Sequence, residues 1–224
     1  MLKHIFVLIF LTLTLFAKEN VIFSIDFSQE KDTNDTRALL EKKGFIFKLD
    51  AEDFTFSIHK GRLYIETQKE AAVLFGKFVN TQEIPAYALI EWGVASFPKG
   101  ADWESGNNRL PIGVIMVFGK EKLSSGLAFL APKAPTFLCP FIGEKEQLGK
   151  PYLGKLYKKG GRYYCLSNSG EGKLIRSRFD IAKEYEKAFK KSVEPLSAIA
   201  FQVNTKDTDG KAKAFIQRVT IYSK

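Results

Sequence analysis

Short segments in which apolar and polar side chains alternate recur along nearly the whole chain. The segments VIFSIDF (21–27) and FTFSI (54–58) are clear cases, rich in aromatic and β-branched residues, and AKAFIQRVTIY (212–222) has a similar strand-like composition. A period of two places alternate side chains on opposite faces of a β-strand, so one face can be buried while the other meets solvent. Further segments of strand-like composition are 45–49, 62–66, 71–79, 86–97, 111–119, 126–131, 162–167, 173–179 and 196–203.

Two segments have helical patterns instead. Residues 33–44 begin with capping residues and end with cations before Gly44, and residues 180–191 follow Asp180, which is expected to cap the first turn. Helices do not alternate regularly with strands, which disfavours a doubly wound parallel sheet. The pattern predicts an all-β fold: a two-sheet antiparallel, jelly-roll-like sandwich with two short helices, in which the terminal strands pair.

The length of the chain and its N-terminal sequence indicate how it is divided into a signal and a domain. A chain of 224 residues with 20 phenylalanines suits one large core. Lys3 is followed by an apolar run over residues 5–17, which is typical of an export signal and shorter than the roughly 20 residues of a membrane-spanning helix. We therefore expect a signal peptide at 1–17, a single β-sandwich domain at 18–224, and a periplasmic or secreted protein; an uncleaved membrane anchor is the alternative.

The chain is basic, with a formal net charge of +9, one unit less once Lys3 is removed. Such a balance can attract anionic envelope components such as acidic polymers or lipid headgroups, or it can simply keep the surface solvated. Export argues against nucleic acid as a partner. Partner expectations are therefore a saccharide or an anionic envelope component, with no nucleic acid.

Few residues have the spacing that catalysis requires. His59 is the one histidine outside the predicted signal, which excludes a histidine-based zinc site within one chain, and its place at a predicted hairpin turn indicates a solvent-facing residue. Glu91 and Asp26 each stand alone on their segments, without a second carboxylate two residues away on the same strand, as glycosidases on sandwich folds often have. Carboxylates that meet across strands remain an alternative.

The segment NTKDTDGK (204–211) contains two aspartates beside a glycine. Alignment with a calcium-binding loop fails, because Ile216 occupies the position where a glutamate ligand is required. A turn between two strands is the simpler interpretation. The remaining metal hypothesis is a structural Ca²⁺ held by Asp26, Asp207 and Asp209; no other cofactor is expected.

The two cysteines leave two alternatives open. Cys139 and Cys165 would pair in an oxidising compartment, and the closed loop would stabilise the fold by about 3 kcal/mol. Both also lie among apolar neighbours, where a free thiol packs as a small hydrophobic group.

Two long segments carry a family resemblance. They are ALIEWGVASFPKGADWESGN…PIGVIMVFG and FDIAKEYEKAF…PLSAIAFQVNTKDTDGKAKAFI, with a tryptophan-bearing strand, a P-x-GAD motif and a D-T-D loop before the final strand. The chain resembles the uncharacterised bacterial Domain of Unknown Function 3047 family over residues 20–223. The resemblance implies a fold and no activity. The chain departs from the pattern at Gly106-Asn107-Asn108, where acidic residues are expected.

The loop at 98–110 offers the strongest candidate site. Its sequence, PKGADWESGNNRL, supplies an aromatic ring for stacking on a sugar together with polar hydrogen-bonding groups and a cation. These candidate ligand-binding residues are Trp103, Glu104, Asn107, Asn108 and Arg109. The alternative is that Trp103 folds back as a lid over the end of the sandwich while the polar residues form the turn.

Absence of a catalytic motif favours a non-catalytic exported binding module, with an envelope saccharide as one candidate ligand. The competing hypotheses are a carbohydrate-active hydrolase or lyase, whose carboxylates would converge in a sheet groove, and a structural envelope protein.

Overall fold

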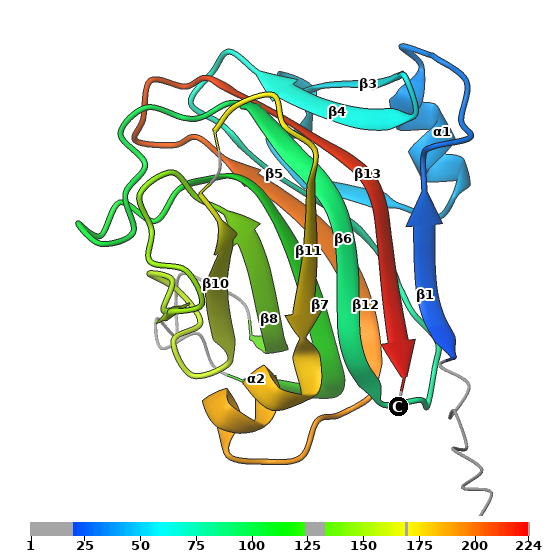
Figure 1. Cartoon of the computed structure of the whole chain (residues 1–224), viewed down its shortest axis with the longest axis vertical. Helices are drawn as coiled ribbons and strands as arrows, with labels where there is room; N and C mark the ends of the chain where they lie inside the picture. Colours follow the sequence, from blue (N-terminus) through cyan, green and yellow to red (C-terminus); the bar gives the residue numbers. More distant parts are fainter. Residues whose placement is uncertain (1–19, 124–132, 169, 224) are drawn as a thin grey trace, which may run out of the picture.

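The computed structural model describes residues 20–123, 133–168 and 170–223, and these residues form two β-sheets packed face to face (Figure 1). The strands of the first sheet, sheet A, are β1 (Val21–Asp26), β3 (Thr55–His59), β4 (Arg62–Thr67), β6 (Pro85–Ser96), β11 (Ile175–Asp180) and β13 (Ala212–Ser223). The strands of the second, sheet B, are β2 (Ile46–Leu49), β5 (Ala72–Phe78), β7 (Leu110–Leu123), β8 (Ala134–Ile142), β9 (Pro151–Tyr152), β10 (Gly161–Ser167) and β12 (Leu196–Asn204).

The strand order makes the chain cross repeatedly between the two layers. Sheet A has the order β11-β6-β13-β4-β3, with β1 also paired to β13, and sheet B has the order β2-β5-β12-β7-β8-β10-β9. The first and last described strands, β1 and β13, are antiparallel neighbours, as expected from the sequence. The predicted all-β jelly-roll-like sandwich is confirmed, with one correction. Among the described strands, β8 and β10 run parallel, because residues 143–160 carry the chain back across the sheet before β10 begins.

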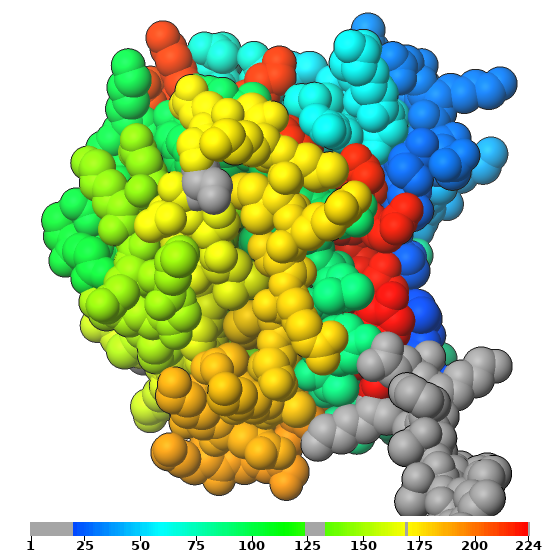
Figure 2. Space-filling model, viewed as in Figure 1, coloured from blue at the N-terminus to red at the C-terminus, as the bar shows by residue number. Residues whose placement is uncertain are grey.

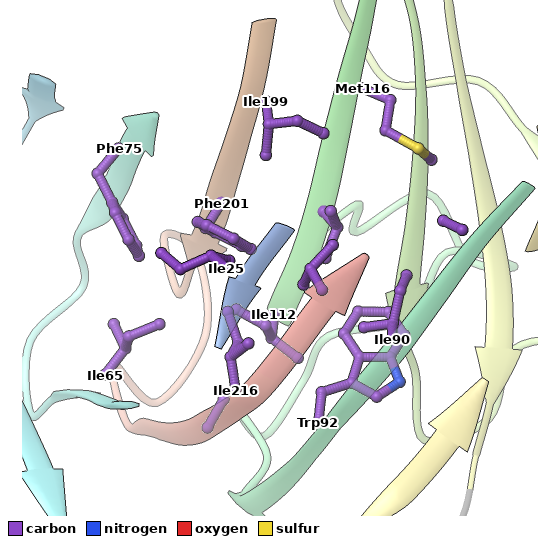
Figure 3. Packing of buried hydrophobic residues seen from close by; sticks show 14 of the residues in the cluster. Ile25, Ile65, Phe75, Ile90, Trp92, Ile112, Met116, Ile199, Phe201 and Ile216 are labelled. Carbon is purple, nitrogen blue, oxygen red and sulfur yellow. The ribbon is translucent and has the colours of Figure 1, made fainter. Parts of the chain in front are cut away.

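The phenylalanines pack between the sheets. Phe56 of sheet A lies 5.3 Å from Phe75 of sheet B between ring centroids, and Phe75 lies 5.2 Å from Phe201 on the neighbouring strand. Figure 3 shows Phe75 and Phe201 of sheet B pointing into the core that they share with Ile65 and Ile216 of sheet A. Because these rings come from strands of both sheets, their burial holds the two layers together.

Both predicted helices form, each slightly shorter than expected. α1 spans Thr36–Lys42, and α2 spans Ile181–Phe189 at one end of the sandwich (Figure 1). Asp180 caps α2 as predicted, since its side chain accepts a hydrogen bond from the backbone N–H of Lys183. A 3₁₀ turn at Ala51–Asp53 was not predicted. Within the described ranges, no helix is long and apolar enough to cross a membrane.

Strand β8 was missed because its sequence does not alternate. Its residues 136–142 are buried without interruption, since the inner face packs on the core and the outer face is covered by side chains from loops. A strand buried on both faces has no polar face to reveal its period. The short β9 was also missed. The strand predicted at 126–131 lies outside the described residues.

The two cysteines are free thiols in the structure. Along the parallel β8–β10 pair, Cys139 lies opposite Tyr163 and Cys165 lies opposite Phe141, so the two cysteines are two residues out of register. Burial raises the pKa of the Cys165 thiol to about 11 and raises that of Cys139 as well. The alternative of two buried thiols that pack as small hydrophobic groups is the one that the structure adopts.

Candidate functional site

Trp103 does not offer an exposed face to a ligand. Its side chain is buried, with a residue exposure of 5%, and its ring centroid lies 4.7 Å from that of Tyr163 and 5.1 Å from that of Phe141. Its Nε1 donates a hydrogen bond of 2.9 Å to the carbonyl oxygen of Arg109. The prediction of a stacking platform is wrong, and the alternative, a lid folded back onto the sheet, is correct.

The polar residues of the same loop also serve the fold. Glu104 accepts hydrogen bonds of 2.5 Å from the Tyr152 hydroxyl and from Lys150 Nζ. Asn107 Nδ2 donates to the carbonyl oxygens of Gly100 and Asp207, at 2.8 and 2.9 Å.

Arg109 and Asn108 complete this network. Arg109 forms an ion pair with Asp207, and its Nε donates to the Lys206 carbonyl at 2.6 Å. The carbonyl oxygen of Asn108 accepts a hydrogen bond from Arg109 at 3.1 Å. Asn107 and Arg109 therefore join the 98–110 loop to the β12–β13 turn, and Glu104 joins it to Lys150 and Tyr152. We assign Trp103, Glu104, Asn107 and Arg109 to structure, whereas Asn108 contributes its backbone carbonyl to this network.

The three aspartates of the metal hypothesis do not come together. Asp26 pairs with Arg218 in the middle of sheet A, whereas Asp207 pairs with Arg109 at the β12–β13 turn. Asp209 closes that turn, since its carboxylate accepts from the backbone N–H groups of Lys99 and Lys211. The segment 204–211 is therefore a turn between two strands, as the simpler interpretation held. In the part of the chain that is described, no group of three or more His, Cys, Asp or Glu side chains could hold a metal ion.

A polar pocket opens on the outer face of sheet A, at the end formed by β3, β4 and β13. Its volume is about 570 Å³. Residues 32–34 form one wall, because Thr33 pairs with Ile58 at the free edge of β3 through two backbone hydrogen bonds. The residues that line the pocket are Asp32, Thr33, Asn34, Ser57, Ile58, His59, Tyr64 and Lys213.

An aspartate–histidine pair forms one side of this pocket. Nδ1 of His59 lies 2.7 Å from Oδ2 of Asp32, and Oδ1 of Asp32 accepts a hydrogen bond of 2.8 Å from the backbone N–H of Lys60. These contacts lower the pKa of Asp32, first through the Lys60 hydrogen bond and, against some desolvation, through His59. The His59 side chain is 55% exposed, which confirms that it faces solvent, and the pairing fixes the orientation of its ring.

Tyr64 forms the aromatic part of the pocket. It lies between Ser57 on β3 and Phe215 on β13 in the sheet register, and its half-buried ring is 5.5 Å from that of Phe215. Lys213 Nζ lies 5.7 Å from the Tyr64 centroid and forms an ion pair with Glu66.

A row of charged residues crosses the centre of the same face. Arg176 on β11 pairs with Glu91 on β6 at 3.1 Å, and Arg218 on β13 pairs with Asp26 on β1 at 2.8 Å. The register places the four residues opposite one another across adjacent strands. Gln217 joins the row by donating to Glu91 at 3.0 Å. Figure 2 shows β11, β6, β13 and β1 side by side on this face.

A β-bulge in β13 produces this arrangement. The register with β6 shifts between Ile216 and Arg218, so both Gln217 and Arg218 oppose Glu91. A bulge of this kind places two consecutive side chains on one face and often occurs at functional sites. Glu91 and Asp26 stand alone on their segments in the sequence, and the strand register brings them into one cross-strand row.

Asp26, one of the two carboxylates of the row, does not have the properties of a general acid. Asp26 and Glu91 lie two strands apart with the Arg218 guanidinium between them, and each forms an ion pair. Burial works against ionisation of Asp26, but hydrogen bonds from Ser28 and Arg218 hold its pKa below the ordinary value. A glycosidase needs one carboxyl group whose pKa is raised, so that it can donate a proton near neutral pH.

Comparisons with known proteins add fold-level similarities only. No family model matches the chain, and no curated protein does. Among solved structures, the xyloglucanase domain of NopAA, a type three effector from Sinorhizobium fredii, in complex with cellobiose, has a TM-score of 0.45 at 10% identity, covering 80% of this chain and 94% of that one. A family 29 carbohydrate-binding module from Piromyces equi has a TM-score of 0.37 at 8% identity, with coverages of 90% and 91%. The family 11 xylanase from Neocallimastix patriciarum has a TM-score of 0.38 at 12% identity, with coverages of 90% and 100%.

Proposed function

We propose that this chain is an exported, non-catalytic binding module that holds a saccharide on the outer face of sheet A, with the pocket around Tyr64 as its primary site. One observation carries the proposal: a 570 Å³ pocket that combines an aromatic ring with polar side chains from separate segments. Its volume lies within the range of small-ligand pockets. Export is proposed from the N-terminal sequence alone.

The chemistry of the lining suits a ring that carries several hydroxyl groups. The apolar C–H face of a sugar can pack on an aromatic ring, while its hydroxyls need both donors and acceptors at the rim. Asp32 supplies acceptors, Lys213 supplies donors, and Asn34 and Ser57 supply both. The pocket therefore matches a polar ligand better than an apolar one.

The backbone holds most of these groups in place before a ligand arrives. Ser57, Tyr64 and Lys213 project from three adjacent strands of one sheet, and Asp32 is fixed by His59 and Lys60. A site on paired strands loses little conformational freedom on binding, which favours affinity.

The hydrolase alternative finds less support. Glu91 and Asp26 are each engaged with an arginine, and the pKa shifts of Asp26 and Asp32 are both downward. A binding role needs no proton transfer and uses the same groups as hydrogen-bond partners.

A glycan array followed by calorimetry tests the proposal. Wild type should bind at least one glycan, and Tyr64→Ala should weaken that binding by about tenfold or more, because the ring contributes more than about 1.4 kcal/mol of apolar contact. Phe78→Ala is the matched control, since this ring is 79% exposed and its strand, β5, belongs to sheet B.

Phe78→Ala should bind as wild type does, and both variants should keep the wild-type circular dichroism spectrum. A wild type that binds no glycan, or a Tyr64→Ala variant that binds with unchanged affinity, would contradict the proposal.

A further inference from the structure

We infer that the saccharide is acidic and extends from the Tyr64 pocket across sheet A, where arginine side chains bind its anionic groups. This inference rests on the proposed function and adds the class of ligand. Four arginines lie on the outer face of the sheet: Arg62 on β4, Arg176 and Arg178 on β11, and Arg218 on β13. We call them the arginine track.

Carboxylates compensate only part of this charge. Glu91 pairs with Arg176, and Asp26 pairs with Arg218. Arg62 and Arg178 have no carboxylate partner among the described residues. Of the other carboxylates on this face, Glu66 is paired with Lys213, and Asp180 accepts a hydrogen bond from the backbone N–H of Lys183 at the start of α2.

The two uncompensated guanidinium groups are held by aromatic rings. The guanidinium carbon of Arg62 lies 4.7 Å from the Phe215 centroid, and that of Arg178 lies 3.4 Å from the Tyr87 centroid. Stacking fixes the plane of a guanidinium while leaving its N–H edge free to donate. This is how a protein orients an arginine toward a carboxylate, a sulfate or a phosphate.

The paired arginines also keep donors free. Arg176 uses Nε on Glu91, and its side chain is 76% exposed, so its two terminal nitrogens face solvent. Arg218 uses Nε and Nη2, both on Asp26 Oδ2. A guanidinium carries five N–H donors, and each pair therefore retains capacity for a ligand.

The track is continuous with the pocket. Tyr64 and Phe215 are in ring contact, and Arg62 lies over the Phe215 ring, next to the bulge that presents Arg218. Tyr64 on β4 is separated from Arg176 on β11 by three strand spacings, roughly 14 Å. A single sugar ring cannot span this distance, which points to an oligosaccharide or a polymer.

The test compares matched acidic and neutral oligosaccharides by calorimetry. The probes are oligogalacturonate, which carries carboxylates, its fully methyl-esterified neutral form, and a sulfated dextran oligosaccharide with its neutral dextran counterpart. We expect wild type to bind at least one acidic probe about tenfold more tightly than its neutral counterpart. This preference should shrink as ionic strength rises from about 50 to about 300 mM, because solvent-exposed charges are screened. The carboxylate and sulfate probes distinguish the two sources of anionic charge.

Arg62→Gln combined with Arg178→Gln should reduce the preference for the acidic probe severalfold, and the remainder should be due to Arg176 and Arg218. Lys187→Gln combined with Lys190→Gln makes the same change in net charge on and beside α2, and should leave the preference intact. Equal affinity of wild type for acidic and neutral probes, or an equal loss of preference in both double variants, overturns the arginine track. If neutral probes bind and Tyr64→Ala removes that binding, the proposed function stands even where the track fails; if no probe of either kind binds, both fail.

Discussion

Replacing Trp103 by alanine separates a structural role of this ring from a binding role. The ring is buried against Phe141 and Tyr163, and its Nε1 bonds the Arg109 carbonyl. Truncation of a buried aromatic side chain costs about 3–5 kcal/mol, which includes the cavity left behind. The carbonyl left without its donor adds to the cost. For a domain of this size, such a loss lowers the melting temperature by roughly 6–20 °C.

Thermal and urea unfolding, followed by circular dichroism, measure this effect. Trp103→Phe is the control, because it keeps most of the ring contact and loses the hydrogen bond, at a cost of about 1–2 kcal/mol. Saccharide binding by the folded fraction of Trp103→Ala should match wild type. A melting temperature within about 2 °C of wild type, combined with lost binding, would show that the ring is a binding platform and that our assignment is wrong.

Three further outcomes are expected. Gly93→Ala should lower the free energy of unfolding by about 1–3 kcal/mol in urea titrations, because the new Cβ would lie 2.3 Å from Phe215 Cζ and from the Lys173 carbonyl oxygen. Gly170→Ala is the control and should leave stability unchanged, because a Cβ at Gly170 has open space around it. The free energy of unfolding should stay constant up to about pH 10 and fall as the pH rises toward 12, because burial raises the pKa of several tyrosines, that of Tyr185 to about 12, and these phenols ionise more easily in the unfolded chain. Absorbance at about 295 nm should show these phenols ionising only together with unfolding. The tyrosines with raised pKa are Tyr152, Tyr163, Tyr164 and Tyr185. Alkylation of the native protein without reductant should modify neither cysteine, and alkylation after denaturation should modify both; a pair that stays unmodified in denaturant would indicate a disulfide.

Most of the fold could be predicted because its signals are local. The alternation of VIFSID and the composition of AKAFIQRVTIY predicted β1 and β13, and their pairing was expected from their places at the two ends of the domain. The cap at Asp180 and the turn at 204–211 follow from the preferences of a few consecutive residues. None of these inferences needs knowledge of a distant contact.

The candidate site could not be predicted because it depends on register between distant strands. Asp26 and Arg218 are 192 residues apart in sequence, and a slip of one residue would turn their side chains to opposite faces. The prediction that Trp103 is an exposed stacking platform failed for a related reason. An aromatic ring in a polar loop has the same sequence whether it faces solvent or folds back onto a sheet, and the deciding contacts come from strands β8 and β10.

One local signal marks the bulge, and it lies in the final strand. In β13, Ile216 and Val219 both point into the core although they are three residues apart, where a regular strand would place inward residues two or four apart. The interval holds Gln217 and Arg218, both of which must then face outward against Glu91. A break in the period of two, with two polar residues between two apolar ones, therefore predicts a bulge with paired polar side chains on one face. Because a bulge leaves its extra residue outside the ladder, such a break is where a sheet can gain a binding group without losing its core.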